Sequence, residues 1–191
     1  MTVTELRTLF RQAVAEMAPI VAHVDTGDLS RATPCAGWDL GQLLAHMLGQ
    51  NRGFAAAVMA GTAEKSALAP APFDQQSWTE SVDRLLEAFD GAADDDQILL
   101  VELLPTERLP LQFVIGAQLL DTVVHTWDVA SALDLEFAPS PQLVAPILAM
   151  AEGIPDDGNR LEPGAAFAPA LPPTDNDWGR LLALLGRRLS T

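Results

Sequence analysis

The strongest constraint on the fold is a long apolar segment, residues 111–133, that carries a line of polar side chains. Its apolar residues recur every three or four positions, as in a buried α-helix; they are Leu111, Phe113, Val114, Ala117, Leu120, Val124, Trp127 and Val129. One side of that helix would carry Gln118, Asp121, His125 and Asp128. Burying these groups is costly unless each has a partner. The segment therefore predicts a central helix whose polar stripe faces inward toward specific partners.

The same spacing predicts further helices on both sides of this segment. Their expected ranges are 4–24, 39–60, 74–89, 140–152 and 175–188. Asp39 and Gln42 have the spacing of a capping box at a helix start, and Gly61 is suited to end that helix. Arg187 would favour the negative end of the last helix dipole. With Leu and Ala abundant, the chain is expected to be all-α.

Three stretches lack helical spacing. Residues 62–73 are rich in Ala and Pro and predict a loop. Residues 97–110 are open to two interpretations, a short strand or an extended connector. Residues 153–173 contain many Pro and Gly and predict an irregular connector. A chain of 191 residues fits one domain, so we expect a single unit over 1–191 with its core in about 4–152.

Charge and composition exclude several classes of function. The chain has 26 acidic and 11 basic residues, a net charge of −15. Such a protein repels phosphate, so no nucleic acid is expected as a partner, and no anionic membrane surface. Its apolar runs are shorter than the roughly 18 residues of a membrane span, and no signal peptide is recognised. The single cysteine forms no intramolecular disulfide, and a reducing cytoplasm is the expected compartment.

Asp121, His125 and His46 are the candidate metal ligands. Asp121 and His125 are four residues apart, so their side chains project from one face of a helix. His46 lies inside the predicted 39–60 helix on a mixed polar face. One carboxylate and two imidazoles are ligands that zinc prefers, and they leave a position open for water or substrate. Helix bundles build such sites from inward side chains on facing helices.

Other interpretations of these residues remain open. Asp121 and His125 could form an ordinary ion pair, with His46 a hydrogen-bonded core histidine, and spacing alone favours this because the motif is weak. Asp128 could orient His125 from behind, or form a hydrogen bond in the neighbourhood of Trp127. His23 is expected at the surface or at a helix end. Cys35 is interpreted as a small packed residue rather than a reactive thiol, because no base lies close in sequence.

Ordered motifs along the chain resemble a known family. They are Thr33-Pro34-Cys35-Ala36-Gly37-Trp38, Leu43-Leu44-Ala45-His46, the segment 51–57, Asp121-x-x-x-His125-Thr126-Trp127-Asp128, and the tail 181–187. Together they resemble actinobacterial DinB-like proteins, which are related to the metal-binding domain of mycothiol-dependent maleylpyruvate isomerase. The resemblance spans most of the chain, and the order of the motifs is more specific than any one of them.

The resemblance implies an up-and-down four-helix bundle that holds one divalent metal through His46, Asp121 and His125. Zinc is the expected metal, with nickel as the alternative, and mycothiol is the expected co-substrate. Gln118 and Asp128 would orient ligands, and Arg52 would bind a substrate carboxylate.

This chain departs from the isomerase in two ways. Its acidic ligand is Asp121, one methylene shorter than the glutamate of the isomerase, so the geometry and metal preference are expected to differ. The isomerase also has a C-terminal domain that contributes to its active site. This chain is expected to lack that domain, and isomerisation of maleylpyruvate itself is therefore not expected.

Three functions stay open at this point. The first is a metal-dependent enzyme that uses a small thiol, either a transferase or an isomerase-like enzyme. The second is a non-catalytic protein that binds a metal or small ligand on the same scaffold. The third is a metal-free structural or dimerisation module, and a homodimer is compatible with all three.

Overall fold

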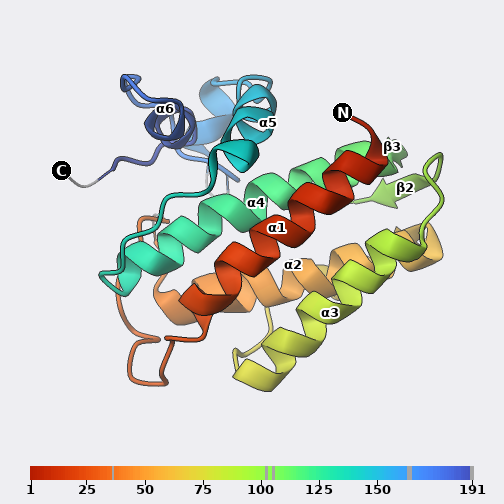
Figure 1. The fold of residues 1–191 in the computed structure, drawn as a ribbon, viewed down its shortest axis with the longest axis horizontal. Helices are drawn as coiled ribbons and strands as arrows, with labels where there is room; N and C mark the ends of the chain where they lie inside the picture. The colour runs from red at the N-terminus through yellow and green to blue at the C-terminus, as the bar shows by residue number, and fades with distance from the viewer. Residues whose placement is uncertain (36, 102, 105, 163–164, 190–191) are drawn as a thin grey trace.

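The computed structural model describes residues 1–35, 37–101, 103–104, 106–162 and 165–189. Ala36 of the first motif and residues 163–164 of the predicted connector lie outside the described residues. Four long helices lie side by side (Figure 1): α1 (Val3–Val21), α2 (Leu40–Ala60), α3 (Gln75–Gly91) and α4 (Leu111–Ala132). The predicted all-α bundle is confirmed.

Local sequence signals account for the ends of α2. The Asp39 carboxylate accepts a hydrogen bond from the backbone N–H of Gln42, and the Gln42 side chain accepts one from the N–H of Asp39, which completes the predicted capping box. Gly61 ends the helix with a φ of 75°, a left-handed conformation that favours glycine. The capping box therefore sets where α2 starts, and with it the position of His46.

The bundle does not alternate strictly in direction. Arg7, at the start of α1, donates to the carbonyls of Phe89 and Ala92 at the end of α3. The N–H of Leu111, at the start of α4, donates to the carbonyl of Asp96, just beyond α3. Helices α1 and α4 thus run one way and α2 and α3 the other, which differs from the expected up-and-down order.

Segment 61–74 makes the parallel arrangement of α2 and α3 feasible by returning the chain along α2. It contains β1 (Thr62–Ala63) and the short 3-10 helix η1 (Lys65–Leu68), which was not predicted. Here η1 packs directly on α2, because Gly53 has no Cβ that would collide with Leu68.

A small sheet covers one end of the bundle. Strand β2 (Gln97–Leu100) pairs in parallel with β1 and antiparallel with β3 (Leu109–Pro110). The ambiguous segment 97–110 therefore contains two short strands, β2 and β3. The sheet lies at the end of the bundle where α2 and α3 finish. The connection formed by residues 22–39 lies at the opposite end, between the end of α1 and the start of α2.

The C-terminal part packs on α4 and contains the two predicted helices together with a short 3-10 helix that was not predicted. It consists of α5 (Pro141–Ala151), the 3-10 helix η2 (Gly158–Leu161) and α6 (Asp177–Leu184). Arg160 of η2 is 8% exposed and donates to the carbonyls of Pro155, Ala168 and Leu184. Arg160 thus connects two parts of the predicted connector to each other and to the end of α6. Since α6 ends at Leu184, Arg187 lies beyond the helix and does not serve its dipole.

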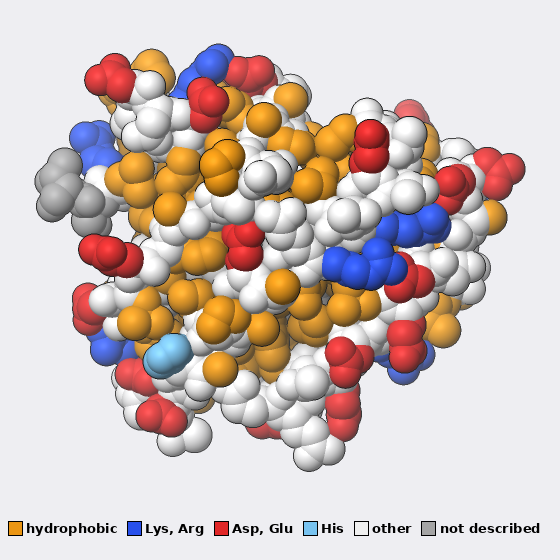
Figure 2. All heavy atoms as spheres, viewed as in Figure 1, with side chains coloured by type: hydrophobic (Ala, Val, Ile, Leu, Met, Phe, Trp, Pro, Cys, Tyr) orange, Lys and Arg blue, Asp and Glu red, His pale blue; other side chains and the backbone are white. Residues whose placement is uncertain are grey.

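The polar stripe of α4 faces inward as predicted. Gln118, His125 and Asp128 are buried, whereas Asp121 is partly exposed. Acidic side chains are scattered over the face seen in Figure 2 rather than gathered in one patch. Within the described part of the chain, no helix is long and apolar enough to cross a membrane.

Candidate metal centre

Helices α2 and α4 bring His46, Asp121 and His125 together. One ligand atom from each lies within 4.8 Å of the other two. Nε2 of His125 is 3.3 Å from Oδ1 of Asp121, and Nε2 of His46 is 3.9 Å from the same oxygen. The two imidazole rings are 5.4 Å apart at an interplanar angle of 81°. All three donors therefore converge on one point between the helices.

The spacing of these atoms fits a tetrahedral zinc ion. Ligand atoms at 2.0–2.2 Å from such an ion lie about 3.3–3.6 Å apart. The His125–Asp121 distance of 3.3 Å already lies in this range, and the His46–Asp121 distance of 3.9 Å exceeds it by a few tenths of an ångström. The side chains of Asp121 and His46 are 29% and 21% exposed. The site is accordingly open on one side to an incoming ligand.

A buried carboxylate orients His125 from behind. Nδ1 of His125 lies 2.8 Å from Oδ2 of Asp128, whose side chain is fully buried. Asp128 in turn accepts hydrogen bonds from Nε and Nη2 of Arg187, at 2.9 and 2.8 Å. With Nδ1–H donating to Asp128, Nε2 is the nitrogen presented to Asp121 and His46. Carboxylates placed in this way commonly orient metal-ligating histidines.

The charges of the cluster shift the pKa values of its members. Burial by itself lowers the pKa of His125, but the carboxylates of Asp121 and Asp128 outweigh it and raise that pKa to about 9. Burial raises the pKa of Asp121, yet the neighbouring His125 outweighs that and holds it well below 3.8. Without metal, the proton on Nε2 of His125 therefore compensates the negative charge of Asp121, which a bound cation would otherwise compensate.

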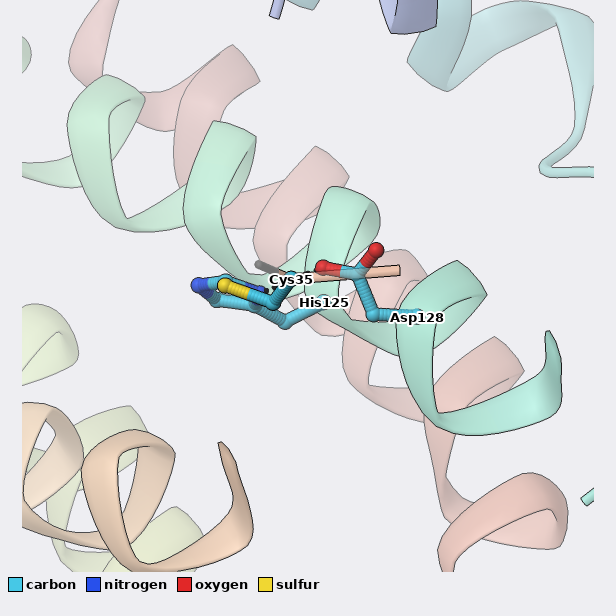
Figure 3. Close-up of side chains that lie close together, drawn as sticks. All are labelled: Cys35, His125 and Asp128. Carbon is cyan, nitrogen blue, oxygen red and sulfur yellow. Dashed lines mark hydrogen bonds and ion pairs between the residues drawn. The ribbon is translucent and has the colours of Figure 1, made fainter. Parts of the chain in front are cut away.

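A second group of potential ligands adjoins the first. Cys35 lies with His125 and Asp128 so that one ligand atom of each is within 4.8 Å of the others (Figure 3). Both oxygens of Asp128 already accept hydrogen bonds from Arg187. A metal in this second group would have to displace that guanidinium, so the group with His46 and Asp121 is the better site. Burial raises the pKa of the Cys35 thiol, and Arg187 offsets this in part.

Sequence reasoning did not foresee three neighbours of the site. Arg187 lies 59 positions from Asp128 in the chain, and only the cost of burying Asp128 signalled that some cation must approach it. Trp38 packs on His46 with ring centroids 4.8 Å apart. Cys35 was interpreted as a packed residue because no base is near in sequence, yet in space it lies beside His125.

Other predicted residues lie elsewhere or have other contacts. Gln118 is buried, and its Nε2 donates to Oδ1 of Asn51 on α2 at 3.2 Å. Arg52 is exposed, and its charge adds a minor part to the lowering of the pKa of Asp74, which is mainly due to the hydrogen bonds from Ser77 at the start of α3. Six residues separate Arg52 from His46, which places it on a different face of α2, so the structure does not bring it to the three ligands. His23 is at the surface as expected.

Comparisons with known proteins agree with this architecture. The family model described as the mycothiol maleylpyruvate isomerase N-terminal domain matches residues 10–130. The chain is also 27% identical over 186 residues to the uncharacterized protein Rv0738 of Mycobacterium tuberculosis, covering 93% of this chain and 94% of that protein.

Two solved structures share the fold. The crystal structure of the mycothiol-dependent maleylpyruvate isomerase has a TM-score of 0.59 at 15% identity, covering 98% of this chain and 90% of that one. A histidine-to-alanine variant of that enzyme has a TM-score of 0.53 at 13% identity, covering 79% and 68%. The first match spans nearly all of both chains. It therefore does not fit the expectation that this chain lacks a counterpart of the enzyme's C-terminal part.

We predict that Arg187→Met lowers the free energy of unfolding by about 3–5 kcal/mol, because it leaves the Asp128 carboxylate buried without its cation. Urea unfolding followed by circular dichroism measures this. Arg188→Met is the matched control: Arg188 is exposed, so its replacement should change stability by about 0.5 kcal/mol or less. Similar losses for the two variants would contradict a stabilising role for the buried pair.

The pH dependence of stability without metal follows from the shifted pKa values. The pKa of His125 rises from 6.5 to about 9 on folding, so its stabilisation is complete below pH 6.5 and is lost as pH rises through 9. The pKa values of Asp121 and Asp128 fall below 3.8, so their stabilisation is complete above pH 3.8 and is lost on acidification. The cluster thus stabilises the protein most between pH 3.8 and pH 6.5.

We therefore expect the Tm of chelator-treated protein to fall between pH 6.5 and 9, and His125→Gln to reduce that fall. The zinc-induced rise in Tm should instead grow over the same range, because the metal displaces a proton from His125. Differential scanning fluorimetry across this range checks both trends. A zinc-induced rise that shrinks as pH increases would contradict the assignment of His125 as a ligand.

Proposed function

Because the chain belongs to the mycothiol maleylpyruvate isomerase N-terminal domain family, we propose that it is a metal-dependent enzyme that uses a small thiol of the mycothiol type. His46, Asp121 and His125 hold one zinc ion in this proposal. The reaction class is transfer of the thiol to an electrophile or thiol-assisted isomerisation. Residues 1–191 act as one unit, and the protein works in the reducing cytoplasm.

The observation that carries this proposal is the convergence of three donor atoms from α2 and α4 within 4.8 Å of one another. His46 lies at least 75 positions before the other two donors, Asp121 and His125, in the sequence. A surface ion pair between Asp121 and His125 would not require His46 to point at the same oxygen. Nor would it require Nδ1 of His125 to be held by a buried carboxylate. Both features support a site built to present Nε2 of His125 to a cation.

Each residue has a defined part in this proposal. Asp121 supplies one negative charge, and His46 and His125 supply neutral imidazole nitrogens. Asp128, held by Arg187, keeps the single N–H proton of the neutral His125 ring on Nδ1. Trp38 limits rotation of the His46 ring by packing against it. When bound, the metal is a Lewis acid that lowers the pKa of a coordinated thiol, so the thiol reacts as its thiolate near neutral pH.

The thiol is assigned by analogy with the family. The descriptions of the family and of both solved structures name mycothiol-dependent maleylpyruvate isomerase, and the partly exposed Asp121 leaves the metal accessible from solvent. The electrophilic substrate is a small molecule. We do not assign Arg52 to bind it, because Arg52 lies on another face of α2.

The metal-free interpretation also has a specific observation in its favour. His125 lies between Asp121 and Asp128, and with a proton on each nitrogen it balances these two carboxylates together with Arg187, without a metal ion. In that case the cluster would be purely structural. Metal binding is therefore the property that separates the two interpretations.

The test uses protein without a histidine tag. We expect about one zinc per chain by elemental analysis, and a zinc-dependent rise in Tm that follows the affinity of the site. His46→Ala should abolish that rise, whereas His23→Ala, which removes an exposed histidine, should leave it unchanged. With metal-loaded protein, mycothiol should be consumed in the presence of a suitable electrophile from a broad panel.

Distinct results would contradict distinct parts of the proposal. If the protein stays metal-free, and wild type and His46→Ala have equal Tm in zinc, then both the metal-dependent enzyme and the non-catalytic metal-binding protein are excluded. Protein that binds one zinc at this site but leaves mycothiol unchanged across the panel would indicate a non-catalytic binding protein.

A further inference from the structure

Three buried polar side chains form a hydrogen-bonded network across α3, α2 and α4. Ser81, Asn51 and Gln118 are 3%, 4% and 1% exposed. Nε2 of Gln118 donates to Oδ1 of Asn51 at 3.2 Å, and Nδ2 of Asn51 donates to Oγ of Ser81 at 3.2 Å. The Ser81 hydroxyl in turn donates to the backbone carbonyl of Trp78 at 2.7 Å. These three side chains are called the polar network below.

The carbonyl of Trp78 fixes the direction of every hydrogen bond in the polar network. A carbonyl oxygen can only accept, so the Ser81 hydroxyl uses its one proton there and accepts from Asn51. Nδ2 of Asn51 is therefore the donor, which leaves its Oδ1 to accept from Gln118. The network thus ties Gln118 of α4 to the backbone of α3 through one side chain of α2.

The stability of the fold does not explain why these amides are buried. Oε1 of Gln118 has no hydrogen-bond partner among the described residues. An unpaired buried acceptor costs at least as much as a neutral hydrogen bond contributes, and apolar groups of similar shape can replace a buried polar pair with little loss. A buried amide between helices can instead specify one register at a cost in stability, because only one alignment pairs it.

The register that the polar network specifies is the one that the candidate metal ligands need. Asn51 lies five residues beyond His46 on α2. Gln118 lies five residues before the midpoint of Asp121 and His125 on α4. Since α2 and α4 run in opposite directions and rise equally per residue, these equal steps bring His46 level with that midpoint.

The hydrogen bond between Asn51 and Gln118 has no substitute at this contact. Among the described residues it is the one side-chain hydrogen bond that joins α2 to α4. Its donor and acceptor atoms are buried, so water does not compete for them. A slip of α2 by one residue would move His46 by about 1.5 Å along α4, whereas metal–ligand distances tolerate changes of only about 0.2 Å.

We propose that Asn51 and Gln118 are positioning residues of the metal centre. Their hydrogen bond, anchored by Ser81, fixes the register of α2 against α4 and so places His46 opposite the two donors of α4. The network acts on the metal through His46, without binding the ion itself. This inference rests on the metal site of the proposed function.

The test compares metal affinity with stability in the same variants of the full-length protein. In Asn51→Leu/Gln118→Met, apolar side chains of similar shape replace both amides, and Ser81 keeps its bond to the carbonyl of Trp78. The Tm of this double variant in chelator should equal or exceed that of wild type, since no buried amide is left unpaired. Its Kd for Zn²⁺, measured by isothermal titration calorimetry, should rise by about tenfold or more, as for other changes to groups that orient metal ligands.

Two single variants separate positioning from stability. Gln118→Met alone leaves Oδ1 of Asn51 buried without a donor, so the Tm and the affinity for Zn²⁺ should both fall. The second substitution should then restore the Tm but not the affinity. Gln12→Met is the matched control: Nε2 of Gln12 donates to the Ser140 hydroxyl at 2.6 Å, so the same replacement breaks a hydrogen bond that does not join α2 to α4. Its Kd for Zn²⁺ should equal that of wild type.

The outcomes separate this inference from the proposed function. A wild-type Kd in the double variant would overturn the positioning role and leave the metal site intact. Losses of affinity that follow the Tm across all variants would also overturn it, because the network would then only stabilise the fold. If the wild-type protein binds no zinc, the proposed function fails and this inference fails with it.

Hydrogen exchange in the wild type gives a second measurement that needs no variant. The side-chain N–H protons of Gln118 should exchange slowly with solvent in both the metal-free and the zinc-loaded protein, unlike those of the exposed Gln76. Nuclear magnetic resonance follows both signals. Fast exchange of the Gln118 protons, or a change to fast exchange when zinc binds, would contradict a register that is set before the metal arrives.

Discussion

The buried ion pair between Asp128 and Arg187 is the contact on which the rest of the structure depends. Asp128 is fully buried in the central helix, where an unpaired carboxylate would be strongly destabilising. Arg187 reaches it from beyond α6 with hydrogen bonds of 2.8–3.1 Å. The pair fixes the C-terminal part against α4, and the remaining acceptor capacity of Asp128 orients His125. Fold stability and site geometry are therefore coupled through one carboxylate.

The two histidines of the candidate centre are held by different physical means. His125 is oriented by a hydrogen bond to a buried charge. His46 is oriented by where α2 starts and by its contact with the Trp38 ring, and its side chain is more exposed than that of His125, 21% against 10%. The His125 side is thus rigid and the His46 side adjustable. Closure of the site around a metal is expected to move His46 rather than α4.

Local signals in the sequence predicted the elements that carry the site but not their assembly. The Asp39–Gln42 capping box located α2, and the Asp121–His125 spacing located two donors on one face of α4. Contacts between residues far apart in sequence had no local signal: Arg187 binds Asp128, and Cys35 lies beside His125. The parallel course of α2 and α3 was missed because it depends on how segment 61–74 packs back on α2. Arg52 lies on a different face of α2 from His46, so its role in binding a substrate carboxylate stays a prediction.

The most direct test of the central claim is a crystal structure of untagged protein grown with zinc, with anomalous data collected on both sides of the zinc edge. We predict one anomalous peak between α2 and α4, about 2 Å from Nε2 of His46, Nε2 of His125 and an oxygen of Asp121. Nδ1 of His125 should stay bonded to Asp128. Absence of a peak there, with His125 still paired to Asp121, would contradict the claim and leave the cluster as a metal-free charge network.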